Sequence, residues 1–218
     1  MRPPPQTETE LQNRLDAIAG LSVTELAEQL GEPVAENLRH HKGWLGDLIE
    51  HALGCDAASL SEPDFTSLGI ELKTVPLNKQ GKVQESTYVC AVPMQTAINL
   101  QWQQSCVYKK LRYVLWLPVE ADASIPLAQR RIGQGLLWRA PETALQCLQQ
   151  DWEEHMDRIS MGQFESITAH QGEVLQIRPK AANSKVLCDA IGPEGKIIKT
   201  LPRGFYLRPS FTRNILYA

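Results

Sequence analysis

The sequence of 218 residues lacks both clustered cysteines and long apolar runs. Its five cysteines are odd in number and scattered, without a Cys-x-x-Cys pair, which argues against a disulfide framework and against a zinc site. We expect them to be buried or half-buried thiols. No apolar stretch approaches the length of a membrane span, and the proline-rich start leads into polar residues rather than a signal peptide. We therefore expect a soluble, cytoplasmic protein.

The chain also lacks an overall excess of basic residues, because its formal net charge is -3. This balance argues weakly against a protein that coats nucleic acid indiscriminately. The charges are unevenly spread: basic residues dominate from Arg178 onward, whereas acidic residues crowd the segment 151–157. A basic C-terminal part suits local contact with phosphate groups. The same charges are also typical of an ordinary solvated surface.

No internal repeat, low-complexity segment or clean linker divides the chain. The spacing of apolar residues and of capping residues predicts helices that follow Thr7 and Ser22, and further helices at 42–54 and 143–160. In the helix at 42–54, Glu50 lies on the polar side. A short helix is also expected from Asn183 to Gly192.

Alternation of apolar and polar residues predicts strands at 70–75, 87–93 and 113–119, which we expect to form the central sheet. Segments 165–170 and 173–178 are expected to form a hairpin, and 204–207 a last strand. These elements favour a discontinuous α/β fold with two lobes around a cleft.

The segment from Asp64 to Lys73 joins an acidic residue, a glycine and a Glu-x-Lys pair on an expected strand. Because side chains alternate along a strand, Glu71 and Lys73 share one face. Gly69 supplies a bend that lets Asp64 fold back beside Glu71, so that two carboxylates can hold a Mg²⁺-like ion near Lys73. Phosphodiester hydrolysis needs these parts. An isolated Glu-x-Lys pair is otherwise commonly an ion pair on a solvated strand.

Several blocks of sequence, which follow one another in a fixed order, carry a resemblance to the MutH family of methyl-directed mismatch-repair endonucleases. They lie at 42–44, 69–74, 114–116, 125–131, 175–183 and 201–206. The resemblance covers nearly the whole chain, and it implies an α/β, restriction endonuclease-like mixed sheet flanked by helices. It also implies a single domain, 1–218, with two lobes around a DNA-binding cleft. Catalytic elements are then expected within 42–120 and DNA-reading elements within 165–218.

The resemblance implies roles for individual residues near the expected metal site. Asp64 and Glu71 correspond to the metal-binding carboxylates of the family, and Lys73 to the lysine near the attacking water. Glu50 corresponds to an additional acidic residue that binds a second ion or a metal-bound water, although it also suits a plain helix surface. The backbone carbonyl of Leu72 is a further expected metal ligand.

A lysine close to the active site of the family corresponds to Lys110, although its neighbour Lys109 is a competing match. Phosphate contact, or no role at all, stays open for Lys110.

For DNA recognition, the resemblance points to Lys42, Arg178, Pro179, Lys180 and Tyr206. A loop after a strand can enter the major groove, where lysine and arginine suit guanine and backbone carbonyls suit the adenine amino group. Tyr206 then lies where a methyl group on adenine would clash, which would give the choice of strand. A buried tyrosine with a bonded hydroxyl is the alternative for this position.

The resemblance implies an enzyme that uses one or two Mg²⁺ ions and nicks the unmethylated strand of DNA at hemimethylated GATC sites, with MutL as activator. We expect a monomer, because the sequence offers one such site and no heptad seam that would announce a dimer. A stand-alone type II restriction endonuclease is the second hypothesis, and a catalytically silent DNA-binding module is the third. The chain ends slightly earlier than expected for the family, which predicts a shortened last helix.

Overall fold

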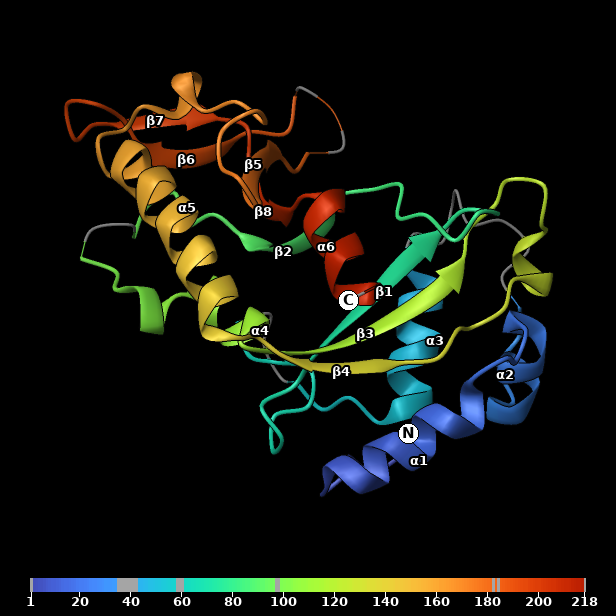
Figure 1. Cartoon of the computed structure of the whole chain (residues 1–218). Coiled ribbons are helices and arrows are strands. Elements are labelled where there is room, and N and C mark those ends of the chain that lie inside the picture. Colours follow the sequence, from blue (N-terminus) through green and yellow to red (C-terminus); the bar gives the residue numbers. More distant parts are fainter. Residues whose placement is uncertain are drawn as a thin grey trace. The chain divides into compact units, whose positions relative to one another are not determined.

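The computed structural model describes residues 2–34, 43–57, 61–96, 99–181, 183 and 185–217. The chain divides into two compact units, and each unit is discontinuous in sequence (Figure 1). The first unit comprises residues 1–84 and 113–138, and the second comprises 85–112 and 139–218. None of the helices in these described ranges has the length and apolar character that crossing a bilayer requires.

Helices and a small sheet make up the first unit. The helices are α1 (Glu8–Ile18), α2 (Val23–Leu30) and α3 (Trp44–Leu53), with a 3-10 turn η2 (Leu127–Gln129). The strands are β1 (Glu71–Leu77), β3 (Tyr113–Glu120) and β4 (Leu136–Arg139), in the order β1-β3-β4. β1 and β3 run parallel, with Glu71 opposite Val114.

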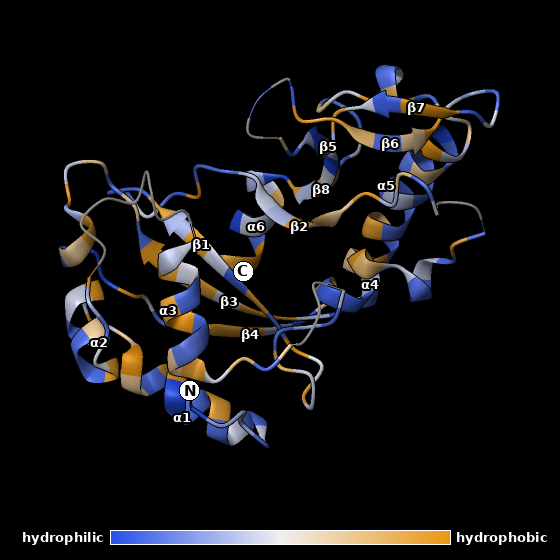
Figure 2. Ribbon diagram, turned by 180° about the vertical axis from the view of Figure 1, so that it is seen from behind, coloured by the Kyte–Doolittle hydropathy of each residue, from blue (hydrophilic) through white to orange (hydrophobic). Residues whose placement is uncertain are grey.

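The helix starts expected in the first unit are confirmed by their caps. The Thr7 hydroxyl accepts a hydrogen bond from the Glu10 amide at 3.1 Å. Ser22 and Glu25 form a reciprocal capping box, in which each side chain accepts from the backbone amide of the other. Hydrophobic and hydrophilic positions are interspersed along α1 and α3, as Figure 2 shows.

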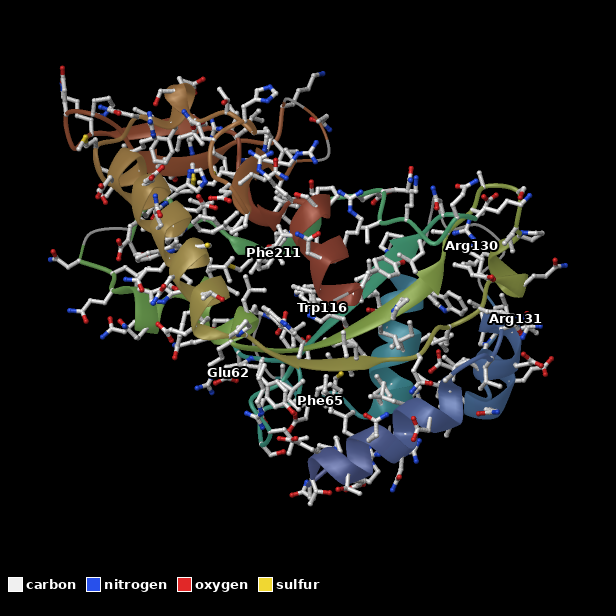
Figure 3. All side chains as sticks on the ribbon, in the orientation of Figure 1. Glu62, Phe65, Trp116, Arg130, Arg131 and Phe211 are labelled. Atoms are coloured by element: carbon white, nitrogen blue, oxygen red, sulfur yellow. The ribbon has the colours of Figure 1, made fainter. Side chains whose placement is uncertain are left out.

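The core of the first unit lies between these helices and the sheet. It includes Leu11, Leu15, Leu48, Ile49, Phe65, Ile70, Leu115 and Leu117. Phe65 and Trp116, both labelled in Figure 3, are fully buried. Phe65 follows Asp64 directly, so the burial of its ring anchors the turn that carries this carboxylate.

Two antiparallel sheets and several helices make up the second unit. The helices are α4 (Cys106–Leu111), α5 (Glu142–Ser160) and α6 (Pro209–Leu216), with 3-10 turns η1 (Trp102–Gln104) and η3 (Phe164–Ser166). The strands β2 (Thr87–Ala91), β8 (Arg203–Leu207) and β5 (Leu175–Pro179) form one sheet in this order. β6 (Cys188–Ile191) and β7 (Ile197–Thr200) form the other.

The expected α/β class and the helix at 143–160 are confirmed, but three expectations about individual segments are wrong. The strand expected at 87–93 does not join a central sheet with β1 and β3; as β2 it pairs with β8. The alternation in a strand predicts its two faces and not its partner, and this partner lies far along the chain.

The hairpin expected across Gln171-Gly172 does not form, because the described structure has no strand at 165–170. Side chains satisfy the backbone there instead. The Arg208 guanidinium donates to the carbonyls of Ala169, Gln171 and Gly172. The strand that does form, β5, pairs with β8.

The helix expected from Asn183 to Gly192 is also wrong, since residues 188–191 form β6 and turn into β7. Gly192, which suits a helix end, opens this turn instead: its amide donates to the Lys196 carbonyl at 2.8 Å. The expectation that the cysteines are buried or half-buried is wrong for Cys147, which is exposed.

Candidate active site

A tight turn brings Asp64 back to the start of β1. Phe65 and Ile70 form an antiparallel bridge, with the Phe65 amide donating to the Ile70 carbonyl at 2.9 Å and the Ile70 amide donating back at 3.3 Å. Gly69 has φ of +65°, a left-handed conformation that glycine adopts without strain. The chain therefore reverses between residues 65 and 70, as the position of Gly69 predicted.

The Asp64 carboxylate bonds directly to β1, because its Oδ2 accepts a hydrogen bond from the Leu72 amide at 2.8 Å. In a strand, the N–H and C=O of one residue point to the same side. The Leu72 carbonyl therefore faces the same side of β1 as Asp64. This side of β1 faces away from β3, because β1 is the edge strand in the order β1-β3-β4.

Glu71 and Lys73 meet on one face of β1, as their alternation predicted. Lys73 Nζ lies 2.5 Å from Glu71 Oε1. The Glu71 side chain is only 1% exposed and that of Lys73 is 12% exposed, so this pair is shielded from water. A solvated edge pair would be open to solvent; this one is not, which sets it apart from the ordinary strand-surface ion pair.

Glu50, on α3, lies close enough to these groups for their charges to shift the pKa of its carboxyl group. Partial burial raises the pKa of its carboxyl group, and nearby negative charges raise it further, while Lys73 acts in the opposite direction. The negative charges belong to Asp64, Asp47 and Glu71. An accumulation of carboxylates of this kind favours the binding of a cation, which offsets their mutual repulsion.

The donor set fits a hard ion that keeps part of its water shell. Within the described residues, no three acidic, histidine or cysteine side chains form a group that could hold an ion by themselves. Magnesium needs no such group, because it is commonly held by one or two carboxylates, with water filling the remaining positions. Asp64, Glu71 and the Leu72 carbonyl could supply three oxygen ligands.

Asp56 contributes to this site although the sequence did not single it out. Its carboxylate accepts hydrogen bonds from the Thr66 amide at 2.9 Å and the Thr66 hydroxyl at 2.8 Å. Its own amide donates to the Asp64 carbonyl at 2.9 Å. These bonds tie the end of α3 to the turn that carries Asp64. An Asp that binds a backbone ten residues later leaves no recognisable local pattern.

Lys110 belongs to the second unit, where it lies on α4 and is 6% exposed. Its neighbour Lys109 is exposed. The two lysines are thus in different environments, and Lys110 is the one withdrawn from bulk water. Its expected role near the active site stays a prediction.

The residues expected to read DNA come together in the second unit. Arg178 and Pro179 end β5, and the Lys180 amide donates to the Pro202 carbonyl at 2.7 Å. Gln176 lies opposite Tyr206 in the β5–β8 register. Lys42, by contrast, lies outside the described residues.

An aromatic residue that the sequence did not single out joins this group. Lys180 Nζ lies 3.4 Å from the centre of the Tyr88 ring, and the Tyr88 and Tyr206 rings meet edge to face at 5.3 Å. Burial raises the pKa of the Tyr206 hydroxyl, while the positive charge of Arg178 opposes this shift. We call Tyr88, Arg178, Lys180 and Tyr206 the recognition cluster.

Gly204 makes room for the two tyrosine rings. A Cβ atom at this position would lie 2.9 Å from Tyr88 Cε2 and 3.1 Å from Tyr206 Cε2. A larger residue would push the rings apart. The cluster therefore depends on β2, β5 and β8 being paired in this register.

Comparison with known proteins gives one consistent relationship. The family model described as the DNA mismatch repair enzyme MutH matches residues 53–151. The chain is 50% identical to a DNA mismatch repair protein MutH of Vibrio campbellii over 216 residues, covering 99% of this chain and 96% of the relative. MutH proteins of Enterobacter sp. strain 638 (49% over 216 residues, 99% and 94% covered) and Shewanella woodyi (50% over 212 residues, 97% and 92% covered) are similar to the same degree. The chain belongs to the MutH family of DNA mismatch repair enzymes.

Proposed function

We propose that this protein is a metal-dependent endonuclease of DNA mismatch repair that nicks the unmethylated strand at hemimethylated GATC sites and is activated by MutL. Membership of the family supports the repair role. The observation that carries the nuclease proposal is the bond from Asp64 to the backbone of β1 beside the shielded Glu71–Lys73 pair.

Asp64, Glu71 and the Leu72 carbonyl would hold Mg²⁺, and Glu50 would bind a second ion or a metal-bound water. When bound, the ion would make a coordinated water more acidic and polarise the phosphate group. The Leu72 amide holds the Asp64 carboxylate in place for this role. Asp56 is not a ligand; by accepting a hydrogen bond from the Thr66 amide it supports the turn that carries Asp64.

Lys73 supplies the positive charge that faces the reacting phosphate. Glu71, at 2.5 Å, stabilises its ammonium group and orients it along β1. A preorganised cation of this kind stabilises the negative charge that builds up during phosphodiester cleavage. In this proposal Lys73 orients the attacking water and stabilises the negative charge on the phosphate. Glu71 pairs with Lys73 and is also a ligand of the metal.

The recognition cluster would supply the sequence preference. Arg178 and Lys180 carry the donors that suit guanine in the major groove, and both are exposed. Tyr206 is partly exposed beside them. A methyl group on a neighbouring adenine would clash with its ring, and binding in that orientation would be disfavoured. This arrangement would discriminate between DNA strands without any change in the chemistry at Asp64.

The decisive experiment measures cleavage of unmethylated, hemimethylated and fully methylated GATC duplexes in Mg²⁺, with and without MutL. We expect nicking of the unmethylated strand, stimulation by MutL, and no cleavage of the fully methylated duplex. Efficient double-strand cleavage without MutL would instead favour a stand-alone restriction endonuclease. Specific binding without any cleavage would favour a silent DNA-binding module.

A monomer would explain why the enzyme nicks. GATC is palindromic, so a symmetric dimer would place active sites on both strands and break the duplex. One protein per site cuts one strand per binding event, which leaves the parental template intact. Sedimentation on hemimethylated duplex should show one protein per site, and a stable pair of proteins that makes concerted breaks would contradict this proposal.

A further inference from the structure

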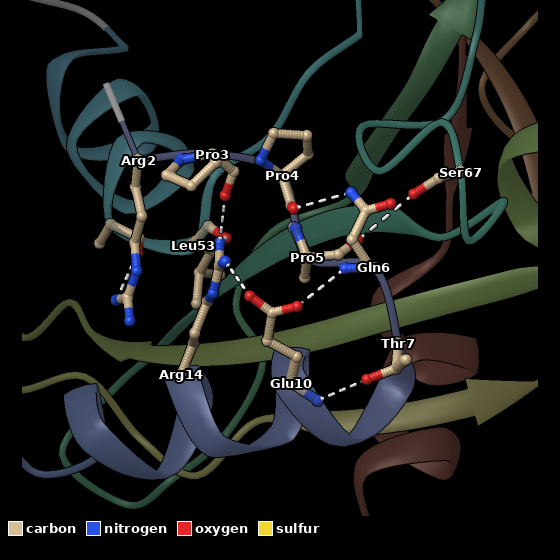
Figure 4. A network of polar contacts seen from close by, with 11 residues as sticks. Arg2, Pro3, Pro4, Pro5, Gln6, Thr7, Glu10, Arg14, Leu53 and Ser67 are labelled. Carbon is tan, nitrogen blue, oxygen red and sulfur yellow. Dashed lines mark hydrogen bonds and ion pairs between the residues drawn. The ribbon is translucent and has the colours of Figure 1, made fainter.

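The residues that precede α1 pack against elements that carry the candidate metal site (Figure 4). We call residues 2–6 the lead segment. The Arg14 guanidinium, only 4% exposed, connects this segment to α3. Its Nη1 donates to the Pro3 carbonyl and to the Leu53 carbonyl, each at 2.7 Å, and its Nη2 contacts the Glu10 carboxylate. Arg14 therefore joins the lead segment, α1 and the end of α3.

The lead segment makes two further bonds, one to each element of interest. Arg2 Nη1 donates to the Ala52 carbonyl at 3.2 Å, which lies in the last turn of α3. The Ser67 hydroxyl donates to the Pro5 carbonyl at 3.3 Å, and Ser67 belongs to the turn that follows Asp64. One short segment thus contacts both the helix that bears Glu50 and the turn that bears Asp64.

The contacts at α3 are suited to fixing a helix end. Carbonyls in the last turn of a helix have no partner within the helix, and cations near that end are favoured by the helix dipole. Arg14 and Arg2 supply both a hydrogen-bond donor and a positive charge there. Glu50 lies one turn earlier, and its carbonyl accepts from the Gly54 amide at 2.8 Å. Movement of this helix end would therefore move Glu50.

The junction is also closely packed. A Cβ atom at Gly54 would lie 2.5 Å from Arg14 Nη1 and 2.7 Å from the Pro3 carbonyl oxygen. Gly54 also has φ of +82°, which favours glycine. The guanidinium can reach both carbonyls only because no side chain stands in this space.

We propose that Arg14 and the lead segment position the candidate metal site, by fixing the spacing between Glu50 on α3 and Asp64 in the turn. The inference rests on the proposed function for the identity of the metal. Arg14 touches neither the metal ligands nor DNA-reading residues in the described structure, so its role is that of a positioning residue. Arginine suits this role because its planar fork donates to several carbonyls at once, which a lysine ammonium does not reproduce.

The test compares Arg14→Met, Arg14→Lys and Ser67→Ala with the wild type. Ser67→Ala removes only the bond between the turn and the lead segment, at an exposed position, and leaves Arg14 in place. The chemically matched control is Arg131→Met, which removes an arginine bond to a backbone carbonyl, that of Gly20 at 2.7 Å, in the same unit. A second control, Ile18→Ala, lowers stability through the core, also from α1.

Two measurements are made on each variant. The first is amide hydrogen exchange at Leu72, whose N–H is bonded to Asp64. The second is the Mg²⁺ concentration that gives half-maximal nicking, together with kcat and KM for the DNA duplex. For Arg14→Met we expect faster exchange at the Leu72 amide and an unchanged KM for DNA. The Mg²⁺ concentration for half-maximal nicking should rise about tenfold or more, as for other residues that orient metal ligands. Ser67→Ala should show a smaller change in the same direction, and Arg14→Lys should fall between wild type and Arg14→Met.

Arg131→Met and Ile18→Ala should leave both measurements near the wild-type values at temperatures where they are folded. If Arg14→Met matches these controls in both measurements, the inference is overturned. Failure of the proposed function is a separate outcome, because wild-type protein would then not nick GATC duplexes in Mg²⁺. The exchange at Leu72 would still decide whether the lead segment positions Asp64.

Discussion

In the first unit, Asp64, Glu71 and Lys73 lie within one turn and the strand that follows it. In the second unit, Tyr88, Lys180 and Tyr206 come from the β2, β5 and β8 region of a sheet whose strands are distant in sequence. The first group gathers negative charge around a shielded lysine, and the second gathers positive charge around aromatic rings. The proposed catalytic group is thus assembled within a short stretch of the chain, whereas the proposed recognition cluster depends on long-range strand pairing.

This difference predicts that substitutions in the two groups separate into two classes. Changes at the first group should affect the rate of cleavage and leave DNA binding intact. Changes at the second group should affect the choice of sequence or strand and leave the metal requirement intact.

The largest effect is expected at the candidate metal ligands. Asp64→Ala and Glu71→Ala each remove a carboxylate, so we expect no detectable nicking in Mg²⁺. Lys73→Ala should lose about a hundredfold to a thousandfold in kcat, as for other groups that stabilise developing charge. All three should still bind GATC duplexes specifically in Ca²⁺.

Glu62→Ala is a suitable control, because it removes an exposed acidic side chain two residues before Asp64 (Figure 3). It should nick at the wild-type rate. Wild-type nicking by Asp64→Ala would disprove the metal-site assignment, and loss of specific binding in Ca²⁺ would disprove the separation between the two groups.

The same local encoding explains which parts of the fold were predictable. Helices α1, α2 and α5 follow from apolar spacing and from caps such as Ser22, because these contacts are made within a few residues. The bond between Asp64 and the start of β1 was predictable in outline for the same reason, since Gly69 marks the bend.

Long-range contacts were not predictable in this way. Alternation predicts β2 as a strand but does not encode which strand lies next to it, so the expected pairing of β2 with β1 and β3 is wrong. The residues near Gly192 suit both a helix end and a hairpin turn, and pairing between β6 and β7 decided between them. Tyr88 was missed as a member of the recognition cluster because its neighbours Lys180 and Tyr206 arrive only when three strands pair.

The next largest effects are expected at Lys180 and Tyr206. Lys180→Ala should lose about 1–3 kcal/mol of discrimination at one base pair, the usual value of a good contact to a base. Tyr206→Ala should nick methylated and unmethylated strands more equally. Competition between GATC and single-base variants measures the first, and strand-labelled hemimethylated duplexes measure the second.

Lys196→Ala provides the control, because this lysine is exposed and also carries a positive charge in the second unit. It should leave discrimination between sequences unchanged, because it affects binding to all sequences alike. Discrimination by Lys180→Ala equal to that of Lys196→Ala would contradict a base-reading role.

A smaller effect is expected at Tyr88. Its ring holds Lys180 Nζ at 3.4 Å in the absence of DNA, and a cation–π contact at an accessible site contributes about 0.5–1 kcal/mol. Tyr88→Leu should therefore change discrimination at the base pair read by Lys180 by about this amount. Tyr88→Phe keeps an aromatic face and should resemble the wild type. Equal behaviour of the leucine and phenylalanine variants would show that the ring does not orient Lys180.

The smallest effect concerns the support of β5 and is a dependence of stability on pH. His155, on α5, is 1% exposed, and its Nε2 lies 3.0 Å from the Leu175 carbonyl at the start of β5. Burial lowers the pKa of His155, and the bond to Leu175 and the negative charges of Asp151 and Glu154 only partly oppose this shift. In the unfolded chain a histidine has its ordinary pKa of about 6.5.

The sign of the effect follows from proton binding. Just below pH 6.5 the unfolded chain binds a proton at His155 more readily than the folded protein does, so the free energy of unfolding falls as the pH falls towards the lower folded pKa. His155→Gln can still donate to the Leu175 carbonyl but does not titrate. Thermal unfolding at pH 7.5 and 5.5 should therefore show a larger loss of Tm for the wild type than for His155→Gln, since acidic groups common to both cancel in the difference. Equal losses of Tm would exclude His155 as the titrating group. The Mg²⁺ requirement for nicking should be the same for the wild type and His155→Gln. A larger loss of Tm in the wild type, together with this unchanged requirement, would show that β5 can be weakened without disturbing the site around Asp64.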